Sequence, residues 1–194
     1  MDWRRLIDLL KGHVVYLQTH NFPDPDALAA AFGMQVFLNA NGITSTICYA
    51  GNVEKNSTKR MMEEFGIKAV NIDQLPHMAK EDYIVTIDAQ KYNSNITDFV
   101  GREVACIDHH PTLTPCAYEY SDIRICGACC SIVASYFIDS DTTMDANTAT
   151  ALLYGLKMDT DSFNRGVTDF DISMFAYLHK IADNQKITTM YNNN

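Results

Sequence analysis

The sequence has no long apolar run and few basic residues relative to acidic ones. A membrane-spanning helix needs about 20 mostly apolar residues, and no stretch of this chain approaches that length. Its 15 Lys and Arg stand against 24 Asp and Glu, which gives a formal net charge of −9. Long duplex nucleic acid and anionic membranes are bound through basic faces. We therefore expect neither of them as a partner.

The chain also lacks the apolar core of a secretory signal, since residues 1–11 are charged and amphipathic. Without an oxidising compartment, the six cysteines are expected to be reduced and mostly buried as small apolar side chains. Cys126 and Cys129 have C-x-x-C spacing, but no second such pair accompanies them, which disfavours a zinc or redox site. These absences predict a cytoplasmic protein.

No internal repeat or low-complexity tract is present, and the composition is that of a folded domain. Hydrophobic residues make up 47% of the 194 residues and charged residues 20%, which excludes a disordered or fibrous chain. A chain of this length can bury a sizeable core in one domain.

Apolar, β-branched runs alternate with helical patterns along the chain. Strands are expected at 13–19, 44–49, 69–70, 83–87 and 104–107, and helices at 2–11, 27–39, 57–65, 129–138, 145–158 and 170–182. Such alternation is typical of βαβ units. The predicted fold is therefore α/β, with a mainly parallel, doubly wound (Rossmann-like) sheet flanked by helices.

The most distinctive segment is His-Asn-Phe-Pro-Asp-Pro-Asp-Ala at 20–27, between an expected strand and an expected helix. His20, Asp24 and Asp26 are donors for hard divalent ions, and two prolines restrict the turn that holds them. A structural alternative exists, because Pro and Asp are common in turns and Asp26 could cap the helix.

Further donors follow other expected elements. Asp88 ends a strand, residues 108–110 (Asp-His-His) end another, and Asp159 lies where a helix gives way to a loop. Each could be an ordinary strand-end or loop residue. In open parallel sheets, however, the carboxyl ends of the strands border one crevice. Four such placements in one chain favour a joint metal site over independent accidents.

Taken together, these motifs resemble those of the DHH phosphoesterases. The matching elements are the H-x-x-x-D-x-D-A segment at 20–27, the lone Asp88, the signature Asp108-His109-His110 and Asp159. They occur in the family's order over residues 13–163. The similarity is greatest to the branch that includes nanoRNase/pAp phosphatases, and the chain is also similar to RecJ-like proteins.

The resemblance implies two divalent cations, Mn²⁺ or else Mg²⁺, that share Asp88 as a ligand. The other ligands would be His20 and Asp24 for one ion, and Asp26, His109 and Asp159 for the second. A set of carboxylate oxygens with one imidazole per ion is typical of Mn²⁺ sites, whereas zinc is often bound by cysteine thiolates. Two ions about 3.5–4 Å apart can acidify a bridging water and hold the attacking and leaving oxygens.

The resemblance also implies catalytic roles for the remaining signature residues. Asp108 would orient a neighbouring imidazole, and His110 would contact the scissile phosphate or protonate the leaving oxygen. Arg165 lies in a Gly-containing loop and is a candidate for binding substrate phosphate; an exposed arginine is the alternative. Asp161 departs from the family, which usually has a small residue there, and is either a nearby carboxylate or a solvated loop acid.

The function expected from the sequence is hydrolysis of phosphate esters in small nucleotides or short oligonucleotides, as in nanoRNase/pAp phosphatases. The acidic charge favours short substrates over long polymers. The alternatives are a pyrophosphatase or exopolyphosphatase, a cyclic dinucleotide phosphodiesterase, and a nucleotide-binding module without turnover. A homodimer is left open.

Members of the family commonly carry a C-terminal DHH-associated domain, which binds the far end of the substrate. No such segment is present in these 194 residues. We expect a DHH domain over residues 1–187 and the start of an interdomain linker at 188–194, with a stand-alone domain as the alternative. Since binding energy from the remote part of the substrate would be missing, this piece alone is expected to hydrolyse poorly.

Overall fold

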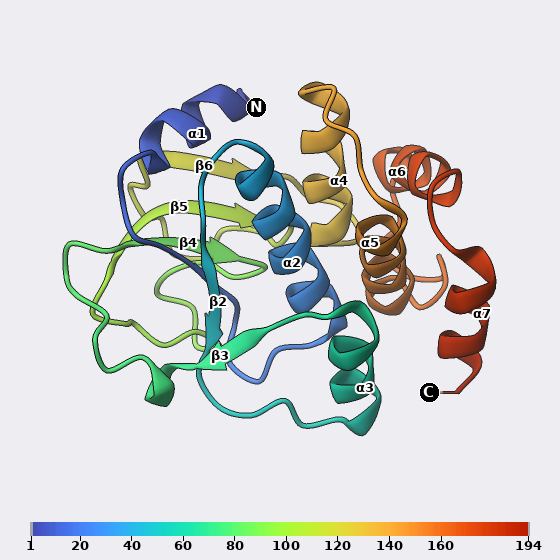
Figure 1. Ribbon diagram of the computed structural model, residues 1–194, viewed down its shortest axis with the longest axis horizontal. Helices are drawn as coiled ribbons and strands as arrows, with labels where there is room; N and C mark the ends of the chain where they lie inside the picture. Colours follow the sequence, from blue (N-terminus) through green and yellow to red (C-terminus); the bar gives the residue numbers. More distant parts are fainter. Residues whose placement is uncertain (1, 194) are drawn as a thin grey trace.

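The computed structural model describes residues 2–193 and is built on a six-stranded sheet with the order β3-β2-β1-β4-β5-β6 (Figure 1). Every adjacent pair of strands is parallel. The strands are β1 (Val15–Gln18), β2 (Thr46–Tyr49), β3 (Ala69–Asn71), β4 (Tyr83–Ile87), β5 (Arg102–Asp108) and β6 (Tyr120–Ile123). This order reverses between β1 and β4, as in doubly wound sheets, and the predicted α/β class is confirmed.

The helices are α1 (Trp3–Leu10), α2 (Pro25–Ala40), α3 (Asn56–Phe65), α4 (Cys129–Asp139), α5 (Ala146–Asp159), α6 (Asp169–His179) and α7 (Asn184–Asn192), with a short 3-10 turn, η1 (Ile72–Gln74). Figure 1 shows α2 beside the sheet, α4 and α5 next to α2, and α6 and α7 farthest from the strands. Over residues 2–193, no helix combines the length and the apolar character that a membrane span requires.

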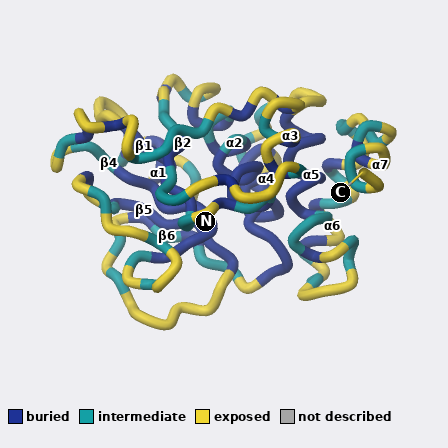
Figure 2. The backbone as a smooth tube through the Cα atoms, turned by 90° about the horizontal axis from the view of Figure 1, so that it is seen from below, coloured by how far each residue is buried: buried dark blue, intermediate teal, exposed yellow. Residues whose placement is uncertain are grey.

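The central strands β1, β4 and β5 are buried at successive positions because this part of the sheet is covered on both faces. Val15 and Leu17 of β1 belong to the main core, which also contains the helices. Tyr16, between them, points to the opposite face, where it packs with Leu75 and Met78 in a smaller cluster. In Figure 2 the buried residues fill the interior, and the exposed ones gather in loops and on the outer helices.

Close packing between α2, α4 and α5 sets where the helix ends lie relative to the strand ends. A Cβ atom on Gly155 of α5 would lie 2.6 Å from Cys130 Sγ and 3.0 Å from Ala29 Cβ. Only glycine therefore allows α5 to approach α2 and α4 this closely. This contact places Asp159, the last residue of α5, near the N-terminus of α2.

Besides the short turn η1, the sequence does not predict one strand and one α-helix. In β6, buried Asp122 makes two hydrogen bonds with Arg124 and one with Tyr136, so the strand lacks a simple apolar pattern. Helix α7 includes most of the segment expected to begin a linker, and its Ile187 is buried. Whether a linker and a further domain follow stays a prediction.

Candidate metal centre

The turn between β1 and α2 places the first group of predicted ligands at the carboxyl edge of the sheet. Asp24, and not Asp26, is the N-cap of α2, because its Oδ1 accepts a hydrogen bond of 2.9 Å from the backbone N–H of Ala27. His20 Nε2 lies 3.6 Å from Asp24 Oδ2 and 3.6 Å from Asp88 Oδ2. One nitrogen of His20 thus faces two carboxylates.

Asp26 lies in the first turn of α2 and is almost completely buried. Its two carboxylate oxygens accept hydrogen bonds from the first turn of α4, at 2.9 Å from Cys129 N and 3.0 Å from Cys130 N. A helix N-terminus favours negative charge. Nevertheless, burial, followed by repulsion from Asp88 and Asp159, raises the pKa of Asp26 well above its usual range. A carboxylate held in this way needs a cation nearby to stay ionised at neutral pH.

Asp88 follows β4 and has a backbone φ of +60°. This conformation is uncommon outside glycine and is sustained here by a hydrogen bond from Asp88 N–H to the carbonyl of Ile107. Asp88 Oδ1 lies 3.1 Å from His109 Nε2, yet both atoms are buried without a hydrogen-bond partner. Buried polar atoms are rarely left unpaired, and these two fit ligands of an ion.

His109 follows β5 and faces the second group of predicted ligands. Its Nε2 lies 3.3 Å from Asp159 Oδ2 and 3.7 Å from Asp26 Oδ2. Its Nδ1 lies 2.9 Å from the carbonyl oxygen of Cys126, to which it donates when it carries a proton. This bond leaves Nε2 as the nitrogen available to a metal ion.

The structure therefore brings the six predicted metal ligands together in two groups, although residues 20 and 159 are far apart in the chain. Within each group the candidate ligand atoms lie within 4.8 Å of one another; the groups are His20, Asp24 and Asp88, and Asp26, His109 and Asp159. Asp88 presents Oδ2 to His20 and Oδ1 to His109. This geometry suits the predicted bridging role. Metal binding itself stays a prediction.

The carboxylates change the protonation of the two histidines. Burial alone would lower the pKa of His20, but its contacts with Asp24 and Asp88 outweigh burial and raise that pKa to about 11. Burial opposes the contacts of His109 with Asp88 and Asp26 in the same way, and the net result is a pKa of about 10. Burial and the neighbouring Asp88 raise the pKa of Asp159 to about 6. Positive charge is thus strongly favoured inside the cluster.

His110, the candidate proton donor, lies at the edge of this cluster. Its Nδ1 is 2.8 Å from Oδ1 of buried Asp108, and this hydrogen bond raises the pKa of His110. Asp108 is held in turn by Gln90, whose Nε2 donates to Asp108 Oδ2 at 2.9 Å and to the carbonyl of His110 at 3.0 Å. The sequence analysis missed Gln90; its only signal is a polar residue two positions after Asp88.

Two other predicted residues lie outside the two ligand groups. Arg165 is exposed, and its guanidinium donates to the carbonyl of Asp159 from Nε at 3.2 Å and from Nη2 at 2.9 Å. Arg165 thus braces the end of α5, while phosphate binding by its side chain stays a prediction. Asp161 is exposed, with a φ of +47°.

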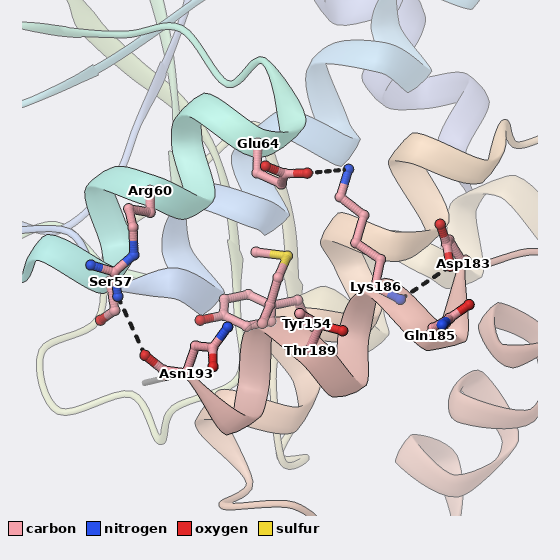
Figure 3. Close-up of a pocket in the computed structure, with 10 residues that line it drawn as sticks. Ser57, Arg60, Glu64, Tyr154, Asp183, Gln185, Lys186, Thr189 and Asn193 are labelled. Carbon is pink, nitrogen blue, oxygen red and sulfur yellow. Dashed lines mark hydrogen bonds and ion pairs between the residues drawn. The ribbon is translucent and has the colours of Figure 1, made fainter.

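Other features of the described residues are separate from this cluster. The candidate metal-binding groups in residues 2–193 contain no cysteine, and burial raises the pKa of Cys126 to about 12. A cavity of about 510 Å³ lies between α3, α5 and α7 and shares no lining residue with the cluster (Figure 3). Its Lys186 and Glu64 form an ion pair of 2.8 Å.

Comparison with known proteins gives matches to the same motif-bearing region. Residues 14–156 match the DHH family, N-terminal domain. An uncharacterized protein of Methanocaldococcus jannaschii is 33% identical over 166 residues, which cover 85% of this chain and 34% of that protein. A "probable manganese-dependent inorganic pyrophosphatase" of Lactococcus lactis subsp. lactis is 25% identical over 146 residues, which cover 73% of this chain and 46% of that protein.

Two solved structures share the fold. A candidate family II inorganic pyrophosphatase of Methanococcus jannaschii matches with a TM-score of 0.70 and 22% identity, over 87% of this chain and 56% of that one. An exopolyphosphatase-related protein of Bacteroides fragilis matches with a TM-score of 0.77 and 17% identity, over 99% of this chain and 59% of that one. The chain spans only about a third to three fifths of the length of these four proteins.

Proposed function

Because the chain belongs to the DHH family through its N-terminal domain, we propose that it is the metal-binding part of a hydrolase that cleaves the P–O–P bond of inorganic pyrophosphate or short polyphosphate. The observation that carries hydrolysis is the convergence of two His/Asp groups on the unpaired atoms of Asp88 and His109. The Lactococcus relative, named as a manganese-dependent pyrophosphatase, supports this substrate class over the nucleotides ranked first from sequence.

Two divalent cations, with Mn²⁺ the first choice, would be held by the two ligand groups. Bound there, they would acidify water for attack on phosphorus and neutralise charge on the substrate. The donor set of carboxylate oxygens and one imidazole per group fits Mn²⁺ or Mg²⁺. Asp88, with one oxygen facing each histidine, is the residue that would couple the two positions.

The protein's own residues supply the remaining chemistry. Asp108, fixed by Gln90, orients His110 through Nδ1, so that Nε2 is the nitrogen available to substrate. A protonated His110 can deliver a proton to the oxygen of the departing phosphate, and the hydrogen bond to Asp108, which raises the pKa of His110, favours the protonated ring. Its ring is about half exposed, which allows contact with a substrate.

The charge of the site explains why cations are needed before substrate. Asp24, Asp26, Asp88 and Asp159 would repel a polyanion, and bound divalent cations reverse the local sign. The same requirement allows a protein with a net charge of −9 to act on small anions. Removing the metal should therefore abolish substrate binding as well as turnover.

A parallel assay of phosphate release tests the proposal. The chain would be incubated with Mn²⁺ and either pyrophosphate, tripolyphosphate, pAp or a dinucleotide, with Asp88→Asn as the control for contaminating phosphatase. We expect the two inorganic substrates to be hydrolysed in preference to the nucleotides, and the control to be inactive. Preferential release of phosphate or nucleoside monophosphate from pAp or the dinucleotide would favour the nucleotide reading instead. Because this chain alone is expected to hydrolyse slowly, the non-catalytic module would be favoured only by tight Mn²⁺ binding with no phosphate release above the Asp88→Asn control, even at high protein concentration.

A further inference from the structure

The peptide group between Cys126 and Gly127 links His109 to a buried carboxylate that is absent from the predicted site. The carbonyl oxygen of Cys126 accepts from His109 Nδ1 at 2.9 Å. The N–H of Gly127, on the same planar peptide group, donates to Asp171 Oδ2 at 2.7 Å. Polarisation passes along such chains, because each bond strengthens the next.

Asp171 is fully buried and is held from several sides. Its Oδ2 also accepts from Thr168 N at 2.9 Å and Thr168 Oγ1 at 2.8 Å, and its Oδ1 accepts from Ser131 Oγ at 2.6 Å. The contacts with Gly127 and Ser131 lie at the start of α4, whose N-terminal amides hold Asp26. Asp171 is thus tied to the same segment that holds two of the predicted ligands.

Gly127 is the residue that permits this arrangement. A Cβ atom there would lie 2.7 Å from Thr160 Cγ2 and 3.0 Å from Asp171 Oδ2. A side chain would therefore push the carboxylate away from the peptide group. The glycine and the carboxylate form one fitted contact, although 44 positions separate them in the chain.

We propose that Asp171 is a positioning residue for the metal centre, acting through the Cys126–Gly127 peptide group on His109. Asp171 fixes the position of the Cys126 carbonyl, which accepts a hydrogen bond from Nδ1–H of His109. This hydrogen bond keeps Nε2 of His109 directed at Asp26 and Asp159. This inference rests on the proposed metal-dependent function. A capping role for Asp171 in α6 alone would require its contacts with Thr168 but not those with Gly127 and Ser131.

The test compares Asp171→Ala and Asp171→Asn with Thr168→Ala in the full chain. Thr168→Ala removes the cap hydroxyl of α6 but keeps the contact of Asp171 with Gly127, so it is the control for a purely structural effect. Calorimetric titration with Mn²⁺ should show affinity lost in both Asp171 variants, by about 10–100-fold for one of two ions, as is typical when an outer partner of a histidine ligand is removed. Thr168→Ala should lose stability without that change.

A second readout does not depend on activity or on Mn²⁺. It is the NMR signal of the Nδ1–H of His109 in protein labelled with ¹⁵N-histidine, assigned by its loss in His109→Gln. This signal should be visible in the wild type and in Thr168→Ala, both without metal and with diamagnetic Mg²⁺. It should shift or exchange faster in the Asp171 variants. If Asp171→Ala fails to fold, the near-isosteric Asp171→Asn carries the test.

An unchanged Nδ1–H signal together with Mn²⁺ affinity within about twofold of wild type would overturn the inference and leave Asp171 as a helix cap. That result would not bear on pyrophosphate hydrolysis, which the phosphate-release assay tests separately. Conversely, a protein inactive on every substrate could still show the expected change at His109.

Discussion

Asp88 has an uncommon left-handed backbone conformation, and its carboxylate lies between two histidines. Its φ of +60° aims the carboxylate so that one oxygen faces His20 and the other faces His109. Left-handed conformations cost about 1–2 kcal/mol for ordinary residues, and asparagine and aspartate tolerate them best. Aspartate at this position therefore both tolerates the left-handed backbone conformation and supplies a negative charge.

Asp88→Asn isolates the charge, because asparagine accepts the same backbone conformation. We expect calorimetry with Mn²⁺ to show that this variant binds neither ion tightly, since Asp88 is the ligand that the two ions are predicted to share and its oxygens face His20 and His109. Asp24→Asn, in contrast, should chiefly weaken the ion beside His20. Retention of two tightly bound ions by Asp88→Asn would refute the bridging assignment.

The loop after α5 contains three consecutive left-handed residues, Asp161, Ser162 and Phe163, with φ values of +47°, +55° and +71°. Asp161 stands where the family usually has a small residue. Asp161→Gly should relieve the local cost and raise stability by roughly 0.5–1 kcal/mol, measured as a higher midpoint in urea, while Mn²⁺ affinity is unchanged. A decrease in affinity would mean that this carboxylate takes part in metal binding.

At the scale of elements, the sequence predicted what local patterning determines. The apolar runs in β1, β4 and β5 predicted these strands, and the two prolines before and at the start of α2 helped to predict that helix. In contrast, β6 is stabilised by the pairing of Asp122 with Arg124 and Tyr136, and α7 by the packing of buried Ile187 and partly buried Met190 against the main core. Neither element has a clear hydrophobic periodicity in the sequence, so both could be identified only from their tertiary contacts.

Helix α7 gives a test of its structural role. Ile187 is 2% exposed and packs into the main core, so Ile187→Ala should destabilise the protein by about 2–4 kcal/mol, measured by urea denaturation. Thr188→Ala, at an exposed neighbouring position, is the control and should stay within about 0.5 kcal/mol of wild type. Equal stability of the two variants would indicate that α7 behaves as a linker.

At the scale of the whole molecule, the strand order explains the site. Strands β1, β4 and β5 are neighbours in the sheet, so residues 20, 88 and 109 meet at its carboxyl edge. Motif spacing and the expectation of parallel strands sufficed to predict that these segments meet, and the resemblance to the DHH phosphoesterases singled out His109 among residues 108–110 as the predicted ligand. The contacts of Gln90 with Asp108 and of Asp171 with Gly127 could not be predicted, because they depend on packing between segments with no shared motif.

The raised pKa values of His20 and His109, about 11 and about 10, link metal binding to pH. Without metal both rings hold protons at neutral pH, and Mn²⁺ must displace them. We expect affinity for Mn²⁺ to rise with pH until about pH 10, where the rings begin to lose these protons without metal, with release of about two protons per chain at neutral pH. Calorimetry in buffers of different ionisation enthalpy measures this release, and a pH-independent affinity would contradict it.

The same values set the pH dependence of stability in the metal-free protein. A histidine whose pKa is raised on folding contributes stability that is complete below the unfolded pKa of about 6.5 and is lost as pH rises through the folded value. With chelator present, the stability that His20 and His109 contribute should therefore decrease between pH 6.5 and about 11. Thermal unfolding of the wild type and His20→Gln would show it as a decline that is weaker in the variant.

The most direct test of the metal centre is a crystal structure of the chain grown with Mn²⁺, with data recorded at the manganese absorption edge. We predict two anomalous peaks about 3.5–4 Å apart, one beside His20 and the other beside His109, with Asp88 between them. A single peak, or peaks that are not in contact with Asp88, would contradict the account.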